Sequence, residues 1–146
     1  MIQKEEADEK VKQGWIRTAM IFEVIGVNED VTKNALKELM EKLDRDKRVA
    51  MYKRDFSDVA KVENPTKTIK QGFSQVCEID LAVKNLESLL EITMGYGPSG
   101  VEILEPKTLQ VPLGEAQSIV STLSQLIHRF AAAGPGGLLF VKEKVA

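Results

Sequence analysis

Two kinds of hydrophobic pattern alternate along residues 15–105. Four segments rich in β-branched and aromatic residues predict strands: residues 15–25, 49–62, 73–83 and 101–104. Two segments repeat apolar side chains at helical spacing and predict helices: residues 29–43 and 85–94. We expect the stretch 49–62 to be one long strand, with a bend near Asp55. The predicted elements therefore follow the order βαββαβ.

This order predicts an α+β fold and resembles the ferredoxin-like fold, a four-stranded antiparallel sheet with both helices on one face. Because that fold hosts enzymes, metal chaperones, RNA binders and effector-binding modules, it leaves the function open. We expect residues 1–14 to be a flexible or helical arm and residues 15–146 to be one domain. In that domain, residues 15–105 form the ferredoxin-like core, and residues 106–146 add a C-terminal helix and tail.

The added helix is amphipathic and spans residues 115–133, and residues 138–141 could form a short fifth strand. Between Glu115 and His128 the helix carries no charged residue, although 29% of the chain is charged. Small neutral polar groups suit a surface that is desolvated by a partner, whereas a plain solvated face is the alternative. We therefore expect this side to contact the open sheet face or a neighbouring subunit. The interface candidates are Gln117, Ser118, Ser121, Thr122, Gln125 and His128.

Composition narrows the class of protein. The 146 residues are 43% hydrophobic, with 20 basic and 22 acidic side chains and a net charge of −2, which argues against disorder and general nucleic-acid binding. One cysteine excludes an intramolecular disulfide and a multi-cysteine zinc site, and one histidine excludes two-histidine metal motifs. We expect no metal and no cofactor. The chain shows neither a signal peptide nor a membrane span, so we expect a cytoplasmic protein without a membrane partner.

Four polar residues on the predicted sheet carry the candidate chemistry. By strand parity, Glu78 and Asp80 project from the face opposite Cys77, away from the two helices. Arg17 and Glu23 have matching positions on the adjacent first strand. Close carboxylates can bind a cation or divide the roles of acid and base, and the guanidinium could hold an anion. Ordinary cross-strand ion pairing would explain the same pattern.

Two sequence motifs lack the context that their usual function needs. Gly95–Gly100 satisfies G-x-G-x-x-G, but it follows a predicted helix and precedes a strand, the reverse of a dinucleotide site. We interpret it as a connecting loop. Residues 71–78 lie where RNA recognition motifs carry stacking aromatic residues, but Gln75 and Glu78 occupy those positions here. Nucleic-acid binding is therefore disfavoured.

Charge is unevenly distributed along the chain. Residues 45–70 carry eight basic and four acidic side chains, whereas residues 78–105 carry one basic and six acidic side chains. A solvated surface explains this pattern, and so would complementary faces that meet when copies of the chain assemble.

These observations favour a non-enzymatic module that self-associates and holds a small effector or a protein partner at a subunit interface. The alternative is a small enzyme or cation-binding protein that uses the carboxylates of the open sheet face. The sequence contains no recognisable catalytic signature, so it leaves the ligand, any reaction and the number of subunits open.

Overall fold

The structure, a computed structural model, describes residues 1–133. The chain divides into two compact units, Met1–Leu109 and Gln110–Ala146, and each is described here by itself. The possible strand at residues 138–141 lies outside the described residues.

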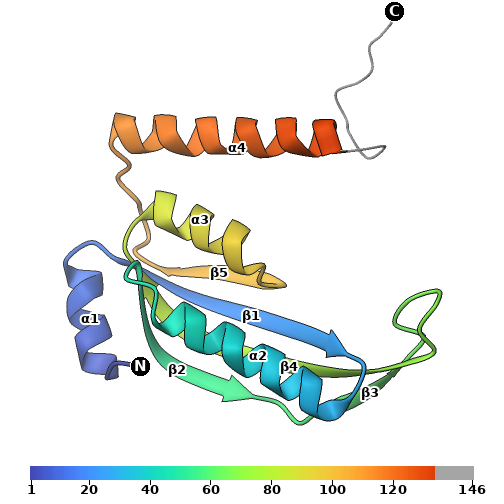
Figure 1. Ribbon diagram of the computed structural model, residues 1–146. Helices are drawn as coiled ribbons and strands as arrows, with labels where there is room; N and C mark the ends of the chain where they lie inside the picture. The colour runs from blue at the N-terminus through green and yellow to red at the C-terminus, as the bar shows by residue number, and fades with distance from the viewer. Residues whose placement is uncertain (134–146) are drawn as a thin grey trace, which may run out of the picture. The chain divides into compact units, whose positions relative to one another are not determined.

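The first unit has an α+β fold, as the sequence predicts, with an open, antiparallel, five-stranded sheet (Figure 1). Strand order is β2-β4-β1-β5, and β3 also pairs with β4. The elements are α1 (Lys4–Lys12), β1 (Ile16–Gly26), α2 (Glu29–Asp44), β2 (Val49–Phe56), β3 (Ala60–Glu63), β4 (Gln71–Val83), α3 (Leu86–Tyr96) and β5 (Gly100–Glu105).

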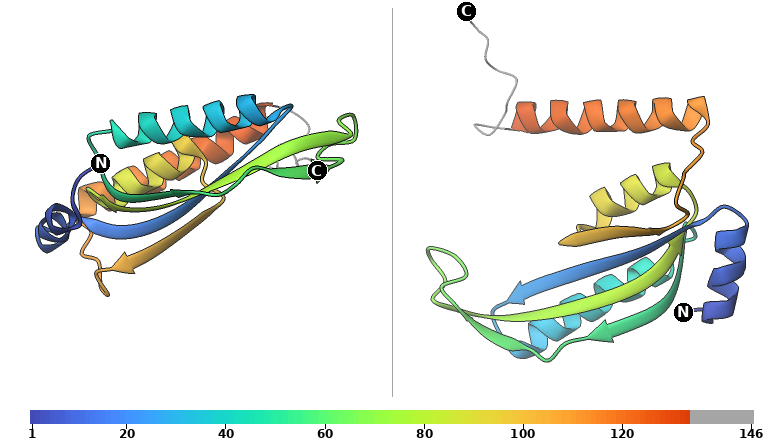
Figure 2. Two further views of the ribbon diagram at one scale, coloured as in Figure 1. Left: turned by 90° about the horizontal axis from the view of Figure 1, so that it is seen from below. Right: turned by 180° about the vertical axis from the view of Figure 1, so that it is seen from behind.

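The pairing of β1 with β4 forms the centre of the sheet and of the core. Their register runs without a shift from Ile16 opposite Val83 to Gly26 opposite Phe73. Because side chains alternate between faces, every second residue of both strands points to the same side. On that side the buried residues of α2 and α3 join those of the strands in one hydrophobic cluster, and both helices lie on this face (Figure 2).

Asparagine residues begin both of these helices. The side chains of Asn28 and Asn85 accept hydrogen bonds of 2.8 Å from the backbone N–H groups of Val31 and Ser88, which satisfies donors that a helix start leaves free. Gly97, with φ 66°, ends α3 in the left-handed conformation that glycine adopts easily. The motif Gly95–Gly100 is thus the end of α3 and its connection to β5.

The expectation of one strand over residues 49–62 is wrong, because the segment is divided between β2 and β3. Ser57 interrupts the pairing with β4. Its side-chain oxygen accepts from the N–H of Val76 at 3.0 Å, and its carbonyl accepts from the side chain of Gln75 at 2.9 Å. The backbone N–H of Ser57 still donates to the carbonyl of Val76 at 2.8 Å, so side-chain atoms supply two of the three hydrogen bonds that join Ser57 to β4.

The N-terminal helix α1 lies against the other face of the sheet, where it contacts β2 and β4. Ala7 of the helix is buried, and so are Ala50 and Ala82 of the two strands. By register, these two strand alanines lie on the face opposite the hydrophobic cluster. Small side chains allow the helix to approach the sheet closely, and the N–H of Ile2 donates to the carbonyl of Met51 at 2.9 Å.

The second unit is described over residues 110–133 and contains α4 (Leu113–Ala133). This helix includes the whole predicted segment 115–133 and begins two residues earlier. Among the described residues, no helix is both long and apolar enough to span a membrane.

A partly buried carboxylate joins the turn after α2 to the end of α3. Asp46 accepts hydrogen bonds from Arg48 Nη2 at 2.7 Å and from the hydroxyl of Tyr96 at 2.9 Å. The Arg48 guanidinium is the main reason why the pKa of Asp46 lies far below its ordinary value. Burial, together with the neighbouring Asp46, raises the pKa of Tyr96.

We predict that Asp46→Asn lowers the free energy of unfolding at pH 7 by about 1–3 kcal/mol, because charge-assisted hydrogen bonds are lost. Since the folded-state pKa of Asp46 is depressed, its contribution is complete above the unfolded pKa of about 4 and declines as the pH falls below it. The difference in the free energy of unfolding between the wild type and Asp46→Asn, measured by urea titration, should therefore be smaller at pH 3 than at pH 7. The exposed Asp58→Asn control should change stability by less than about 0.5 kcal/mol at either pH. A pH-independent effect of Asp46→Asn would contradict this account.

Candidate binding site on the open sheet face

A recess of about 660 Å³ lies on the sheet face that α2 and α3 leave uncovered. Its walls come from α1 and from four strands. The lining residues are Lys4, Arg17, Tyr52, Lys53, Asp80, Leu104 and Glu105. A volume in this range is typical of sites for small molecules.

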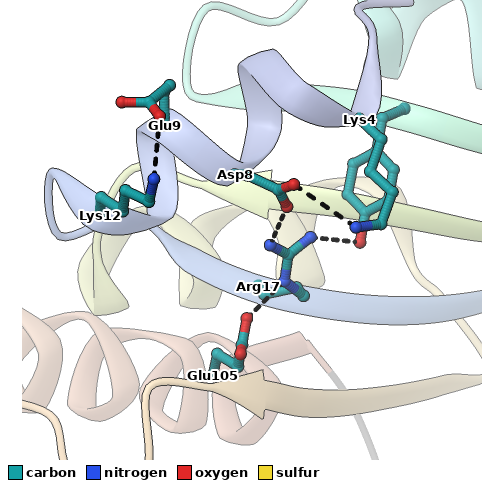
Figure 3. A network of polar contacts seen from close by, with 7 residues as sticks. Lys4, Asp8, Glu9, Lys12, Arg17 and Glu105 are labelled. Carbon is teal, nitrogen blue, oxygen red and sulfur yellow. Dashed lines mark hydrogen bonds and ion pairs between the residues drawn. The ribbon is translucent and has the colours of Figure 1, made fainter.

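Arg17 is the centre of the polar network beside the recess (Figure 3). Its Nε donates to Glu105 at 2.6 Å, its Nη1 donates to the Tyr52 hydroxyl at 2.9 Å, and its Nη2 donates to Asp8. The side chain is only 14% exposed. These partners raise the pKa of Arg17, and the hydrogen bond from Arg17 is the main cause of a lowered pKa at Asp8. One guanidinium thus connects α1, β2 and β5.

Irregular pairing on both sides of the central strands shapes the recess. On one side, Met51 lies opposite Leu81 and Lys53 lies opposite Asp80, so the register shifts at Tyr52. As a result, both Tyr52 and Lys53 line the recess. Bulges of this kind redirect side chains and are frequent beside functional sites.

The same feature recurs where β5 pairs with β1. Thr18 lies opposite Ile103, but Arg17 lies opposite Glu105, so Leu104 is the extra residue. Leu104 and Glu105 consequently both line the recess. Each of the two register shifts therefore brings a pair of adjacent residues to the border of the same recess.

The structure brings together only part of the predicted set. Arg17 and Asp80 line the same recess. Glu78 is farther along β4, opposite Asp55 of β2. Glu23 accepts a 2.5 Å hydrogen bond from the hydroxyl of Ser74. Among residues 1–133, no cluster of three or more potential metal-ligating side chains is present.

Sequence reasoning missed most of the recess. It did not identify Lys4, Tyr52, Lys53, Leu104 or Glu105. Strict alternation places Tyr52 and Lys53 on opposite faces, and the register shift is not visible in a period of two. The charged sequence of the arm, residues 1–14, is compatible with a helix and indicated that α1 could form. It did not indicate where α1 packs, because that position depends on tertiary contacts.

The other candidates lie away from this recess. Cys77 is fully buried, and burial raises its pKa to about 11, so its thiol stays protonated near neutral pH. All six interface candidates lie on α4 in the second unit, where the Gln117 side chain donates to the hydroxyl of Ser121 at 3.1 Å. The interface itself stays a prediction.

We predict that Arg17→Lys loosens α1, because an ammonium group cannot reproduce three directed contacts of a guanidinium. The free energy of unfolding should fall by about 1–3 kcal/mol. Trp15, the single tryptophan of the chain, reports on the arm, since the ammonium of Lys10 lies 4.3 Å from its ring centroid. Its fluorescence emission should shift to longer wavelength in Arg17→Lys.

Lys53→Met is the matched control for this prediction. It removes a charged residue from the recess without touching the three contacts of Arg17, so it should leave both stability and Trp15 emission nearly unchanged. Wild-type stability and emission in Arg17→Lys would contradict the role assigned to the guanidinium.

Comparison with known proteins adds one match. A family model described as the MJ0538 family matches residues 17–145. No curated protein and no solved structure matches the chain. The name of the family states no activity, so the functional argument depends on the geometry of the described residues.

Proposed function

We propose that this chain, which belongs to the MJ0538 family, is a non-enzymatic binding module that self-associates and holds a small effector or a protein partner. A cytoplasmic location is part of the proposal. The single cysteine, which cannot form a disulfide within the chain, is in keeping with a reducing compartment.

We further propose that the first unit is ferredoxin-like. The order β2-β4-β1-β5, with each neighbouring pair antiparallel, supports this interpretation. So does the contribution of both α2 and α3 to one hydrophobic cluster. The extra strand β3 and the helix α1 are additions to such an arrangement.

The apolar stripe of α4 is the observation that carries self-association. Its residues recur at alternating spacings of three and four: Ala116, Ile119, Leu123, Leu126, Phe130 and Ala133. This is the a/d pattern by which helices pair with one another. Within residues 110–133, α4 is the only helix or strand, so these residues contain no second element that could cover the stripe.

The apolar chemistry of the stripe supports a covering partner. Leu123 and Phe130 of the stripe are both exposed, at 39% and 63%. Burying a side chain of this size contributes about 1.5–3 kcal/mol. The neutral residues on the opposite side, such as Ser121 and Gln125, lose little on desolvation and permit a neighbour on that side as well.

A small enzyme or cation-binding protein is the second candidate. The observation in its favour is that Arg17 and Asp80 line one recess. Against it, the three directed contacts of Arg17 are made within the protein. In addition, Asp80 lines that recess, whereas Glu78 lies farther along β4 and is not among the lining residues.

We predict that Leu123→Lys weakens self-association at least tenfold, because a charge replaces a central residue of the stripe; tenfold corresponds to about 1.4 kcal/mol. Sedimentation velocity over a concentration series measures the effect. Gln125→Lys adds the same charge on the opposite side of α4 and should weaken association less.

Two results would contradict the proposed interface. If the wild-type chain stays monomeric at high concentration and low salt, it does not self-associate. If Gln125→Lys weakens self-association as much as Leu123→Lys does, the contact is not confined to the apolar stripe and includes the Ser/Gln side. Circular dichroism of each variant confirms that α4 is still helical.

A separate pair of variants tests the second candidate. Glu78→Ala and Asp80→Ala alter exposed or half-buried carboxylates, so we predict stability changes within about 0.5 kcal/mol and no Mg²⁺ binding in the wild type by calorimetry. Saturable Mg²⁺ binding that both variants abolish would instead favour the cation-binding candidate.

A further inference from the structure

The recess on the open face presents hydrogen-bond donors that the protein leaves available. The Tyr52 hydroxyl oxygen accepts from Arg17 at 2.9 Å, so its own proton is directed elsewhere. Lys4 and Lys53 add two ammonium groups, and both side chains are more than half exposed. Their contacts with Asp8 and Asp55, at 3.4 and 3.5 Å, are long for hydrogen bonds.

The charge balance of the lining residues selects the kind of ligand. Arg17 and Glu105 are paired with each other at 2.6 Å. The other charged lining residues are Lys4, Lys53 and Asp80. The ammonium groups of Lys4 and Lys53 each have one ion-pair partner outside the lining, Asp8 and Asp55, and keep further N–H donors for a ligand. A polyanion would be repelled by the carboxylate of Asp80, and a simple cation would be repelled by the two lysines. A molecule that carries both a carboxylate and an ammonium group complements all three.

The recess also contains one apolar wall. Leu104, the extra residue of the β5 register shift, lines the recess and is 42% exposed. An apolar group of a ligand would cover part of this surface, which contributes roughly 25 cal/mol per Å².

We propose that the recess binds a small zwitterion with a short apolar side chain, of which free apolar α-amino acids are the simplest class. The carboxylate would lie between Lys4 and Lys53 and accept from Tyr52, the ammonium would contact Asp80, and the side chain would cover Leu104. This inference names a ligand class for the binding role proposed above and rests on it. It does not require self-association, because all the residues involved lie in the first unit.

Two-dimensional NMR of the ¹⁵N-labelled full chain tests this inference, with L-alanine and L-leucine as probes. Two fragments of leucine serve as controls: 4-methylpentanoate, which lacks the ammonium group, and 3-methylbutylamine, which lacks the carboxylate. We expect saturable shifts at recess residues with leucine, and at least tenfold weaker binding of each fragment, since each loses about 1.4 kcal/mol or more of charge-assisted contacts.

Variants locate the site. Lys53→Met and Asp80→Asn should each weaken leucine binding at least about fivefold, because each removes one charged contact. Lys61→Met, an exposed change on β3 outside the recess, should leave binding unchanged. Because Lys4 belongs to α1, ligand binding should also alter the fluorescence of Trp15.

The inference is overturned if neither amino acid gives saturable shifts at the recess, or if 4-methylpentanoate binds as tightly as leucine. The second result would show a site for anions alone. Leu123→Lys keeps the two proposals separate. A monomeric Leu123→Lys chain that still binds leucine supports the recess independently, whereas a wild-type oligomer that does not bind leucine contradicts only the recess.

Discussion

The antiparallel pairing of β1 with β4 is the interaction on which the other features depend. Its unbroken register assigns each residue of both strands to one of two faces. One face carries Met20, Phe22, Cys77 and Ile79, which are buried in the cluster that α2 and α3 complete. The other face then receives the charged residues of the same strands, including Arg17 and Asp80. A slip of one residue would bury those charges and expose the core.

Two departures from regular structure give the open face its recess. The arm α1 contacts β2 and β4, where buried alanines allow close approach. Register shifts at Tyr52 and Leu104 then place extra side chains at the border of the recess on both sides. Arg17 holds these parts together through its contacts with Asp8, Tyr52 and Glu105. The recess is therefore a product of tertiary contacts and not of any single sequence motif.

This origin explains which features could be predicted from the sequence. Hydrophobic periodicity predicts the α+β class, the amphipathic helices and the face to which Glu78 and Asp80 belong, because these follow from local spacing. The break at Ser57 could not be predicted, since it depends on hydrogen bonds to Gln75 and Val76 in another strand. Two of the seven residues that line the recess were candidates from the sequence. Arg17 and Asp80 follow from strand parity, whereas Tyr52 and Lys53 share its border only through a register shift.

The helix α4 presents the converse case. Its start follows from the sequence to within two residues, because hydrophobic periodicity is a local property. The partner of α4 does not follow from the sequence, because an apolar stripe indicates that a surface is covered but not which surface covers it. The proposed answer is a second copy of the chain.

Native mass spectrometry of the wild-type protein, purified without added ligand, is the most direct test of self-association and ligand binding, since it records subunit number and retained small molecules together. We expect a discrete oligomer, with additional mass in the range of a small zwitterion on a fraction of the subunits. A bare monomer at every concentration would contradict this expectation, and would assign the stripe of α4 to a separate protein partner or to its own chain.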